Sequence, residues 1–254
     1  MTLTRRTFNR TLTLALASAF ATQAVPSLAQ GRPVNEGIDY RVLSPRQAVS
    51  TDAKKIEVVE FFWFGCPHCN SLDPALLEWL KKAPADVVFK RVHINFDDEN
   101  APVKRTEVHQ RLFYTLETMG VIEKMAPAVF TAIHGDRKPL QTRDSVLEWA
   151  KTKGLDLGKF TATYDDGFNM SRKMKAASAM QAAYKVDGVP YFAIDGQFIT
   201  SPSIAGGSTD AFFNVMNTVI EKVRKARAPA KAELSVDKKA DKKPAKPVKA
   251  SDSK

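Results

Sequence analysis

The sequence predicts an α/β fold in which a sheet domain is split by an all-helical insertion. A dense apolar run at residues 56–63 is typical of a strand buried on both faces. Helical periodicity then extends from about residue 102 to residue 185. Strand character returns at residues 189–200, where Asp195-Gly196 separates two apolar segments. These observations indicate one sheet assembled from both ends of the chain.

The first half of the sheet domain follows from four segments. Residues 39–43 predict a short edge strand, and residues 56–63 predict the central strand. A helix is expected from Pro67 to about Lys81, because proline is favoured in the first helical turn, where its missing N–H costs nothing. Residues 87–94 predict a second strand, parallel to the central one through a right-handed crossover.

The insertion is expected to begin with two helices. Apolar residues from Val108 to Met119 share one helical face, and Gly120 is the expected C-cap. A second apolar face covers residues 121–133 and contains Pro127.

Two further helices complete the insertion. One runs from Ser145 to Lys153, with Asp144 or Ser145 as its N-cap and Gly154 as its stop. The other covers residues 168–184 and is rich in Ala, Met and Lys. The whole block is therefore expected to be helical.

A hairpin and a last helix close the domain. Residues 189–194 and 197–200 predict two strands, and Asp-Gly between them is a strong signal for a tight turn. Residues 208–210, Ser-Thr-Asp, then cap an amphipathic helix. Its apolar residues are Phe212, Phe213, Val215, Met216, Val219, Ile220 and Val223.

The first 29 residues have the pattern of an export signal. A basic start is followed by an apolar stretch at residues 12–24, and small residues at 27–29 predict cleavage before Gln30. The apolar stretch is too short and too rich in alanine for a membrane span. Residues 4–8, Thr-Arg-Arg-Thr-Phe, fit a twin-arginine signal, although paired arginines are also common in Sec signals. Either route leads to an oxidising bacterial periplasm.

The formal net charge of +10 lies partly in a tail at residues 228–254. Lys, Ala, Pro and Asp alternate there without apolar periodicity, so the tail is expected to be disordered. A weak electrostatic contact with an anionic membrane or an acidic partner is the functional alternative. No basic stripe is interleaved with stacking aromatics, so the sequence does not indicate nucleic-acid recognition.

Cys66-Pro67-His68-Cys69 contains the only two cysteines of the chain. The motif follows the central strand and opens the next helix, which places the sulfur of Cys66 at a helix N-terminus. Unpaired N–H groups and the helix dipole stabilise a thiolate there. The arrangement suits reversible dithiol–disulfide chemistry.

Two other uses of the cysteines are less consistent with the pattern. A structural disulfide across two residues would close a tiny loop and remove little entropy from the unfolded chain. Zinc usually takes four ligands, but no second Cys pair is present, and His93, His109 and His134 are scattered without ligand spacing.

Four segments carry a family resemblance: Glu60-Phe61-Phe62, Gly65-Cys66-Pro67-His68-Cys69, Val92-His93-Ile94-Asn95-Phe96 and Gly188-Val189-Pro190. In these the chain resembles the thioredoxin-fold thiol oxidases of the DsbA family, from about Tyr40 to Arg224. The resemblance implies a thioredoxin-like domain at residues 38–101 and 186–226, interrupted by a helical insertion at residues 102–185. The signal peptide at residues 1–29 and the tail at residues 228–254 lie outside it.

The resemblance implies roles for the motif residues. Cys66 is expected to be the sulfur that is attacked and Cys69 the buried resolving one, with Pro67 and His68 completing the catalytic motif. His68 is expected to set the redox potential, because an imidazole near the helix N-terminus stabilises the Cys66 thiolate. A stabilised thiolate makes the disulfide more oxidising, an effect for which DsbA itself is a standard example. A solvated loop histidine is the alternative for His68.

The resemblance also implies roles for residues outside the motif. The family places an acidic residue beneath the disulfide to move a proton for the resolving cysteine, and Glu60 matches it. Its basic partner would be Arg91, where familiar members carry Lys. The alternative is a strand-end glutamate that reaches solvent.

Pro190 matches the family's proline that follows a cis peptide bond. The backbone of Val189 is then expected to face the cysteines and pair with an extended substrate. An ordinary proline at the start of a strand is the alternative.

The implied activity is that of a thiol:disulfide interchange oxidoreductase of the periplasm. The expected substrates are reduced, unfolded secreted proteins, and the expected reoxidant is a quinone-linked membrane partner of the DsbB type. No metal or organic cofactor is expected, and the protein is expected to be a monomer. The rivals are a disulfide isomerase or reductase on the same fold, a non-catalytic peptide-binding module, and a copper- or zinc-binding protein. Isomerases of this kind usually add an N-terminal dimerisation domain, whereas a short stretch separates Gln30 from the core strand.

Overall fold

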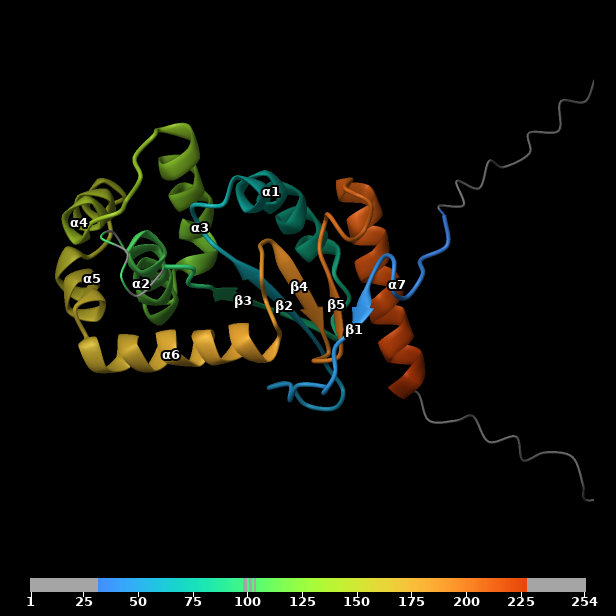
Figure 1. Ribbon diagram of the computed structural model, residues 1–254. Helices are drawn as coiled ribbons and strands as arrows, with labels where there is room; N and C mark the ends of the chain where they lie inside the picture. Colours follow the sequence, from blue (N-terminus) through green and yellow to red (C-terminus); the bar gives the residue numbers. More distant parts are fainter. Residues whose placement is uncertain (1–31, 98–99, 101, 103, 228–254) are drawn as a thin grey trace, which may run out of the picture. The chain divides into compact units, whose positions relative to one another are not determined.

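The structure is a computed structural model that describes residues 32–97, 100, 102 and 104–227 (Figure 1). The predicted signal peptide and the predicted tail lie outside these residues. No helix within the described part of the chain is long and apolar enough to cross a membrane.

A mixed sheet of five strands, in the order β1-β5-β4-β2-β3, forms the centre of the fold. The strands are β1 (Arg41–Val42), β2 (Ile56–Phe62), β3 (Val87–His93), β4 (Tyr191–Ile194) and β5 (Phe198–Thr200). β2 pairs in parallel with β3 and antiparallel with β4, so it joins the early and late parts of the sheet. All seven of its residues are buried, as expected of a strand covered on both faces.

α1 (Pro67–Lys82) and α7 (Thr209–Arg227) pack against one apolar cluster of the sheet. Leu72 and Leu76 of α1 meet Ile56 and Val58 of β2 there, together with the apolar stripe of α7. Cys66 is the N-cap of α1, and no acidic side chain stands in the first turn of that helix.

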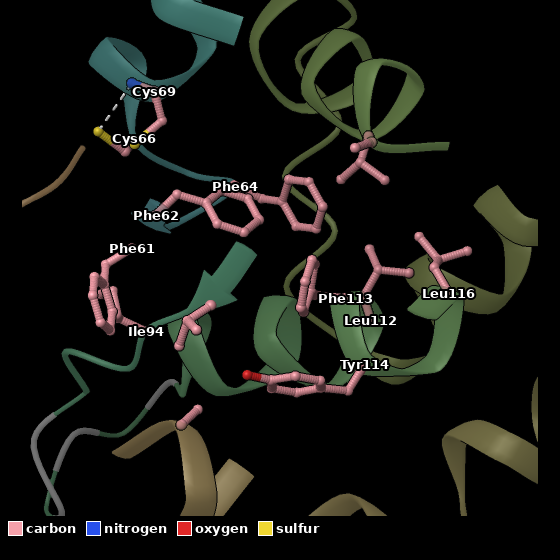
Figure 2. Packing of buried hydrophobic residues seen from close by; sticks show 14 of the residues in the cluster. Phe61, Phe62, Phe64, Cys66, Cys69, Ile94, Leu112, Phe113, Tyr114 and Leu116 are labelled. Atoms are coloured by element: carbon pink, nitrogen blue, oxygen red, sulfur yellow. Dashed lines mark hydrogen bonds between the residues drawn. The ribbon is translucent and has the colours of Figure 1, made fainter. Parts of the chain in front are cut away.

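The remaining helices follow β3 in the chain and precede β4, and Figure 1 shows them grouped beyond one end of the sheet. They are α2 (Arg105–Thr118), α3 (Ile122–Phe130), the π-helix η1 (Thr131–Gly135), α4 (Arg143–Thr152), α5 (Leu157–Tyr164) and α6 (Gly167–Ala183). Their apolar residues form a second cluster with Phe61, Phe62 and Phe64. Figure 2 shows Phe62 and Phe64 facing Phe113 of α2, and both cysteines belong to the same cluster.

The predicted strands and the parallel pairing of residues 56–62 with 87–93 are confirmed. The hairpin is confirmed too, since Asp195 and Gly196 both have left-handed backbones, with φ values of 57° and 66°. The predicted edge strand is shorter than expected, because only Arg41 and Val42 pair with β5.

The predicted N-cap of the helix near residue 145 is wrong. Thr142 is the N-cap, because its Oγ1 accepts the backbone N–H of Ser145 while Ser145 Oγ accepts the backbone N–H of Thr142. Helix α5 was not predicted as a separate element. It begins after Asp156, whose carboxylate accepts the N–H of Lys159 at 2.9 Å. Pro127 lies within α3 and does not end it.

The hairpin turn gives a test of the fold. A Cβ on Gly196 would lie 2.2 Å from the carbonyl oxygen of Gln47, in addition to the strain of a left-handed backbone. Gly196→Ala should therefore lower the free energy of unfolding by more than about 2 kcal/mol in urea titrations. Gly120→Ala is the matched control, because Gly120 also has a positive φ but nothing within 4 Å of its added Cβ. It should cost about 1 kcal/mol, and equal losses would contradict the steric argument.

Candidate active site

Cys66 stands where β2 gives way to α1, and the turn aims backbone N–H groups at its sulfur. As N-cap, it accepts the N–H of Cys69 on Sγ at 3.4 Å. Pro67 follows at the first helical position, where a missing N–H costs nothing. His68 is exposed beside the sulfur, whereas Cys66 and Cys69 are 6% and 0% exposed. Both cysteines are free thiols in this structure.

This environment lowers the pKa of the Cys66 thiol to about 6. The largest cause is a hydrogen bond with the Cys69 side chain, and the backbone N–H groups of Cys69 and His68 and the charge of His68 act in the same direction. Burial opposes them. The helix N-terminus therefore favours the thiolate, as the position of the motif predicts.

Cys69 has the opposite environment. Burial is the main reason that the pKa of its thiol is raised, and its contact with Cys66 and the charge of Glu60 raise it further. At neutral pH the pair thus holds one ionised sulfur next to one protonated sulfur.

The loop before β4, which is far from Cys66 in the sequence, lies next to Cys66 in the fold. The Val189–Pro190 peptide bond is cis, as the resemblance implies. The Cys66 thiol donates a hydrogen bond to the carbonyl oxygen of Val189 at 3.5 Å. Val189 therefore faces Sγ of Cys66 with its backbone carbonyl.

A buried ion network lies beneath the cysteines. Arg91 Nε donates to Glu60 Oε2 at 2.8 Å, and Arg91 Nη2 donates to Asp73 Oδ1. All three side chains are at most 6% exposed. Glu60 thus pairs with Arg91 and does not reach solvent. Asp73 was not singled out from the sequence, although its spacing from Cys69 places both on one face of α1.

Two carboxylates share one cation in this network. Burial raises the pKa of Glu60 to about 7, because Arg91 offsets only part of the desolvation and both Asp73 and Cys66 raise it further. Glu60 can therefore gain or lose a proton near neutral pH. Arg91 cannot, because a guanidinium stays protonated in proteins.

The three histidines outside the motif lie far apart in the sequence, but all of them contact the two residues that follow β2. His93, His109 and His134 each donate to or accept from Trp63 or Phe64, directly before the motif. Phe62 and Phe64 are fully buried core residues, and Trp63 is half-buried. No group of three or more potential metal-binding side chains occurs among the residues that the structure describes.

Comparison with known proteins agrees with this geometry. Residues 57–212 match the model of the DSBA-like thioredoxin domain. The chain belongs to the DsbA family. It is 36% identical over 219 residues to the thiol:disulfide interchange protein DsbA of Bordetella pertussis, which covers 86% of this chain and 98% of that protein. It is 37% identical over 216 residues to its counterpart in Pseudomonas aeruginosa, covering 85% of this chain and 96% of that one.

Solved structures show the same relationship. The crystal structure of Pseudomonas aeruginosa DsbA matches with a TM-score of 0.69 at 38% identity, covering 76% of this chain and 95% of that one. The oxidoreductase NmDsbA1 of Neisseria meningitidis has the same fold, with a TM-score of 0.65 at 21% identity and coverage of 77% and 96%. The chain therefore has the thioredoxin-like fold of the family and is a thiol:disulfide oxidoreductase.

The lowered pKa of Cys66 predicts how the stability of the reduced protein depends on pH. The folded-state pKa of about 6 lies below the reference value of 9.0, so the stabilisation is complete above pH 9 and is lost as the pH falls through 6. Thiolate ultraviolet absorbance of the reduced protein should show a midpoint near pH 6. The difference in free energy of unfolding between the reduced protein and Cys66→Ala should depend on pH. It should be larger at pH 7 than at low pH by about 1.4 kcal/mol, in favour of the unmodified protein.

Cys69→Ala is the informative variant for this titration. It removes the largest cause of the lowered pKa, so the Cys66 midpoint should move to higher pH. His68→Ala should move it in the same direction by less, because the charge of His68 is the smallest of the causes given above. A Cys66 midpoint near its unperturbed value in the unmodified protein would contradict the assignment.

Proposed function

We propose that the chain is a periplasmic dithiol oxidase that donates its Cys66–Cys69 disulfide to reduced, unfolded secreted proteins. A substrate thiolate attacks Cys66 Sγ, the bond between the two cysteines breaks, and Cys69 leaves with the electron pair and takes up a proton. A second substrate thiolate then attacks the substrate sulfur of the mixed disulfide. The substrate disulfide forms and Cys66 leaves as a thiolate, so two electrons pass from the substrate to the enzyme.

The stabilised Cys66 thiolate is the observation that carries this direction of transfer. A thiol with a pKa of about 6 gains roughly a factor of ten from ionisation at pH 7, compared with an unperturbed thiol. This factor favours the reduced enzyme and corresponds to about 30 mV for a two-electron couple. A stabilised thiolate is also a good leaving group in the second step.

Glu60 is proposed to supply and remove the proton of Cys69. Cys69 has no exposed surface, so water cannot protonate it freely. Glu60 is buried, senses both sulfurs electrostatically and has a pKa of about 7, which suits proton transfer at neutral pH. Arg91 then holds the carboxylate in place without taking part in the transfer.

Val189 and Pro190 are proposed to bind the substrate. The carbonyl oxygen of Val189 already accepts a hydrogen bond from Cys66 Sγ, so a chain bonded to that sulfur would pass next to it. An extended substrate segment can pair with this backbone as an added strand, which recognises main chain and tolerates many sequences.

The remaining expectations complete the proposal. The basic and apolar N-terminus supports export to the periplasm by the twin-arginine or Sec route. The reduced enzyme requires a reoxidant, for which we propose a quinone-linked membrane partner of the DsbB type. We propose a monomer that needs no metal or organic cofactor for exchange between sulfurs.

A glutathione redox titration of residues 30–254 tests the direction of transfer. The midpoint should lie well above roughly −180 mV, the value of a disulfide isomerase. A midpoint near about −270 mV would identify a reductant and overturn the proposal. Cys66→Ala, Cys69→Ala should abolish peptide oxidation, whereas retention of the biological effect would favour a peptide-binding module.

Glu60→Gln tests the proton-transfer role. The amide keeps the size of the side chain and accepts a hydrogen bond from Arg91, but it cannot exchange a proton at neutral pH. Formation of the mixed disulfide, in which Cys69 leaves and needs the proton, should slow by about 10- to 100-fold. Its resolution by the second substrate thiolate, in which Cys66 leaves, should change little. Stopped-flow kinetics with a dithiol peptide separate the two steps, and unchanged formation of the mixed disulfide would remove Glu60 from the mechanism.

A further inference from the structure

Three histidines from separate elements converge on the residues that link β2 to the redox motif. His93 ends β3, His109 lies in α2, and His134 lies in the π-helix η1. Each makes a hydrogen bond to Trp63 or Phe64, the two residues between β2 and Gly65. We call these three imidazoles the histidine clamp.

The backbone of Phe64 depends on two members of the clamp. Phe64 has left the sheet and is fully buried, so its N–H and C=O need partners inside the protein. His93 Nε2 accepts the N–H of Phe64 at 3.2 Å, and His134 Nε2 donates to its carbonyl oxygen at 2.8 Å. The path of the chain toward Cys66 is therefore held by side chains instead of a neighbouring strand.

The indole of Trp63 depends on the third member. Its Nε1–H donates to His109 Nδ1 at 3.0 Å, while His109 Nε2 donates to the carbonyl oxygen of Pro139 at 2.7 Å. The indole covers Gly65 so closely that a Cβ there would lie 2.3 Å from a ring carbon. The carbonyl oxygen of Trp63 accepts the N–H of Cys66 at 3.0 Å. A shift of Trp63 must therefore shift Cys66.

Two of these contacts require a neutral imidazole. His93 and His109 each accept a hydrogen bond on one ring nitrogen and face a carbonyl oxygen with the other, so each can carry only one proton. His134 only donates, which both of its protonation states allow. Burial lowers the pKa of His93 and of His109, which keeps both neutral at physiological pH.

The charged groups around the clamp are few. His93 faces His109, and His109 faces His134 and Asp97, whose carboxylate favours the charged imidazole. The rings of Phe62, Phe64 and Phe113 also pack around the His93 ring, and the Tyr114 hydroxyl makes a hydrogen bond with the backbone of His93. Protonation of His93 or of His109 would thus break the hydrogen bond that the imidazole accepts.

We propose that His93, His109 and His134 are positioning residues that hold Trp63 and Phe64, and thereby set the geometry and reactivity of Cys66. The proposal rests on the proposed function only in one respect: it takes Cys66 Sγ as the sulfur that the substrate attacks. It makes the insertion helices part of the redox site, because two of the three imidazoles come from the segment between β3 and β4. It also makes the site sensitive to acid, where the two accepting imidazoles gain protons.

Two substitutions at His109 test positioning against general packing. Gln can accept from the indole and donate to the carbonyl of Pro139, whereas Leu fills the space without either bond. His109→Leu should change the equilibrium constant with glutathione by about five- to tenfold, the effect of one lost hydrogen bond, and His109→Gln by less than about twofold. An unchanged constant in His109→Leu, or equal changes in both variants, would overturn the proposal.

Trp63→Phe provides a second route if His109→Leu fails to fold. It removes the indole donor but keeps an aromatic ring, so it should shift the glutathione equilibrium and the Cys66 thiolate midpoint in the same direction as His109→Leu. The double variant should add little to either single change. Additive shifts would show that the two residues act independently and would contradict the clamp.

Tryptophan fluorescence tests the requirement for a neutral imidazole. Trp79→Phe, Trp149→Phe leaves Trp63 as the single tryptophan, and the oxidised form removes the titration of Cys66. The emission of Trp63 should change in one step below about pH 6.5, the ordinary imidazole value. His109→Gln should abolish that step. A step that persists in His109→Gln would refute the requirement for a neutral imidazole at His109.

These measurements do not depend on oxidation of a protein substrate. If the unmodified chain fails to oxidise peptides while His109→Leu still shifts the glutathione equilibrium, the proposed function fails and the clamp stands. If peptides are oxidised equally well and the equilibrium is unmoved in His109→Leu, the clamp fails and the proposed function stands.

Discussion

The chemistry of this chain depends on the contact between Cys66 and Cys69, in which the side chain and the backbone N–H of Cys69 both meet Sγ of Cys66. This contact exists because Cys66 is the N-cap of α1, the position where a helix leaves its first N–H groups unpaired. The burial of β2 fixes the end of the strand, and the packing of α1 on the sheet fixes the start of the helix. The fold therefore holds the donor and the sulfur in place before any substrate arrives.

The same turn separates the two sulfurs into different environments. Cys66 meets the helix N-terminus and His68, which lower the pKa of its thiol, and its sulfur also faces the backbone carbonyl of Val189. Cys69 is one helical turn further in, without exposed surface and near Glu60. The difference in pKa between the two thiols follows from hydrogen bonding, burial and charge, not from any difference in their covalent chemistry. In the proposed mechanism this asymmetry makes Cys66 the sulfur that is attacked and Cys69 the one that leaves.

Much of this arrangement could be predicted from the sequence, because its signals are local. The apolar run of β2, proline at the start of α1 and Asp195-Gly196 in the hairpin each report on a few adjacent residues. What could not be predicted depends on contacts between distant segments. Nothing in the sequence shows that His93, His109 and His134 meet at Trp63 and Phe64, since each lies in a different element.

The N-cap of α4 shows a local failure of the same reasoning. Thr142, Asp144 and Ser145 are all good capping residues, and only the observed backbone shows which of them has the extended conformation of an N-cap. The role of Asp73 was missed for a different reason. Its carboxylate matters only because Arg91, on another element, forms ion pairs with both Asp73 and Glu60.

The sharing of Arg91 by two carboxylates links this network to the thiols. The buried site contains two carboxylates and one guanidinium, and the guanidinium cannot lose its proton. One of the two carboxylates can therefore be protonated while the other stays ionised. The negative charge of Cys66 raises the pKa of Glu60, so ionisation of the sulfur favours protonation of the carboxylate. The buried carboxylate of Glu60, with a pKa of about 7, can therefore hold or release a proton at neutral pH. In the proposed mechanism Cys69 needs such a proton when it leaves the disulfide. Because Glu60 is paired with Arg91, which stays protonated, the exchangeable proton lies on the carboxylate of Glu60 and not on its basic partner.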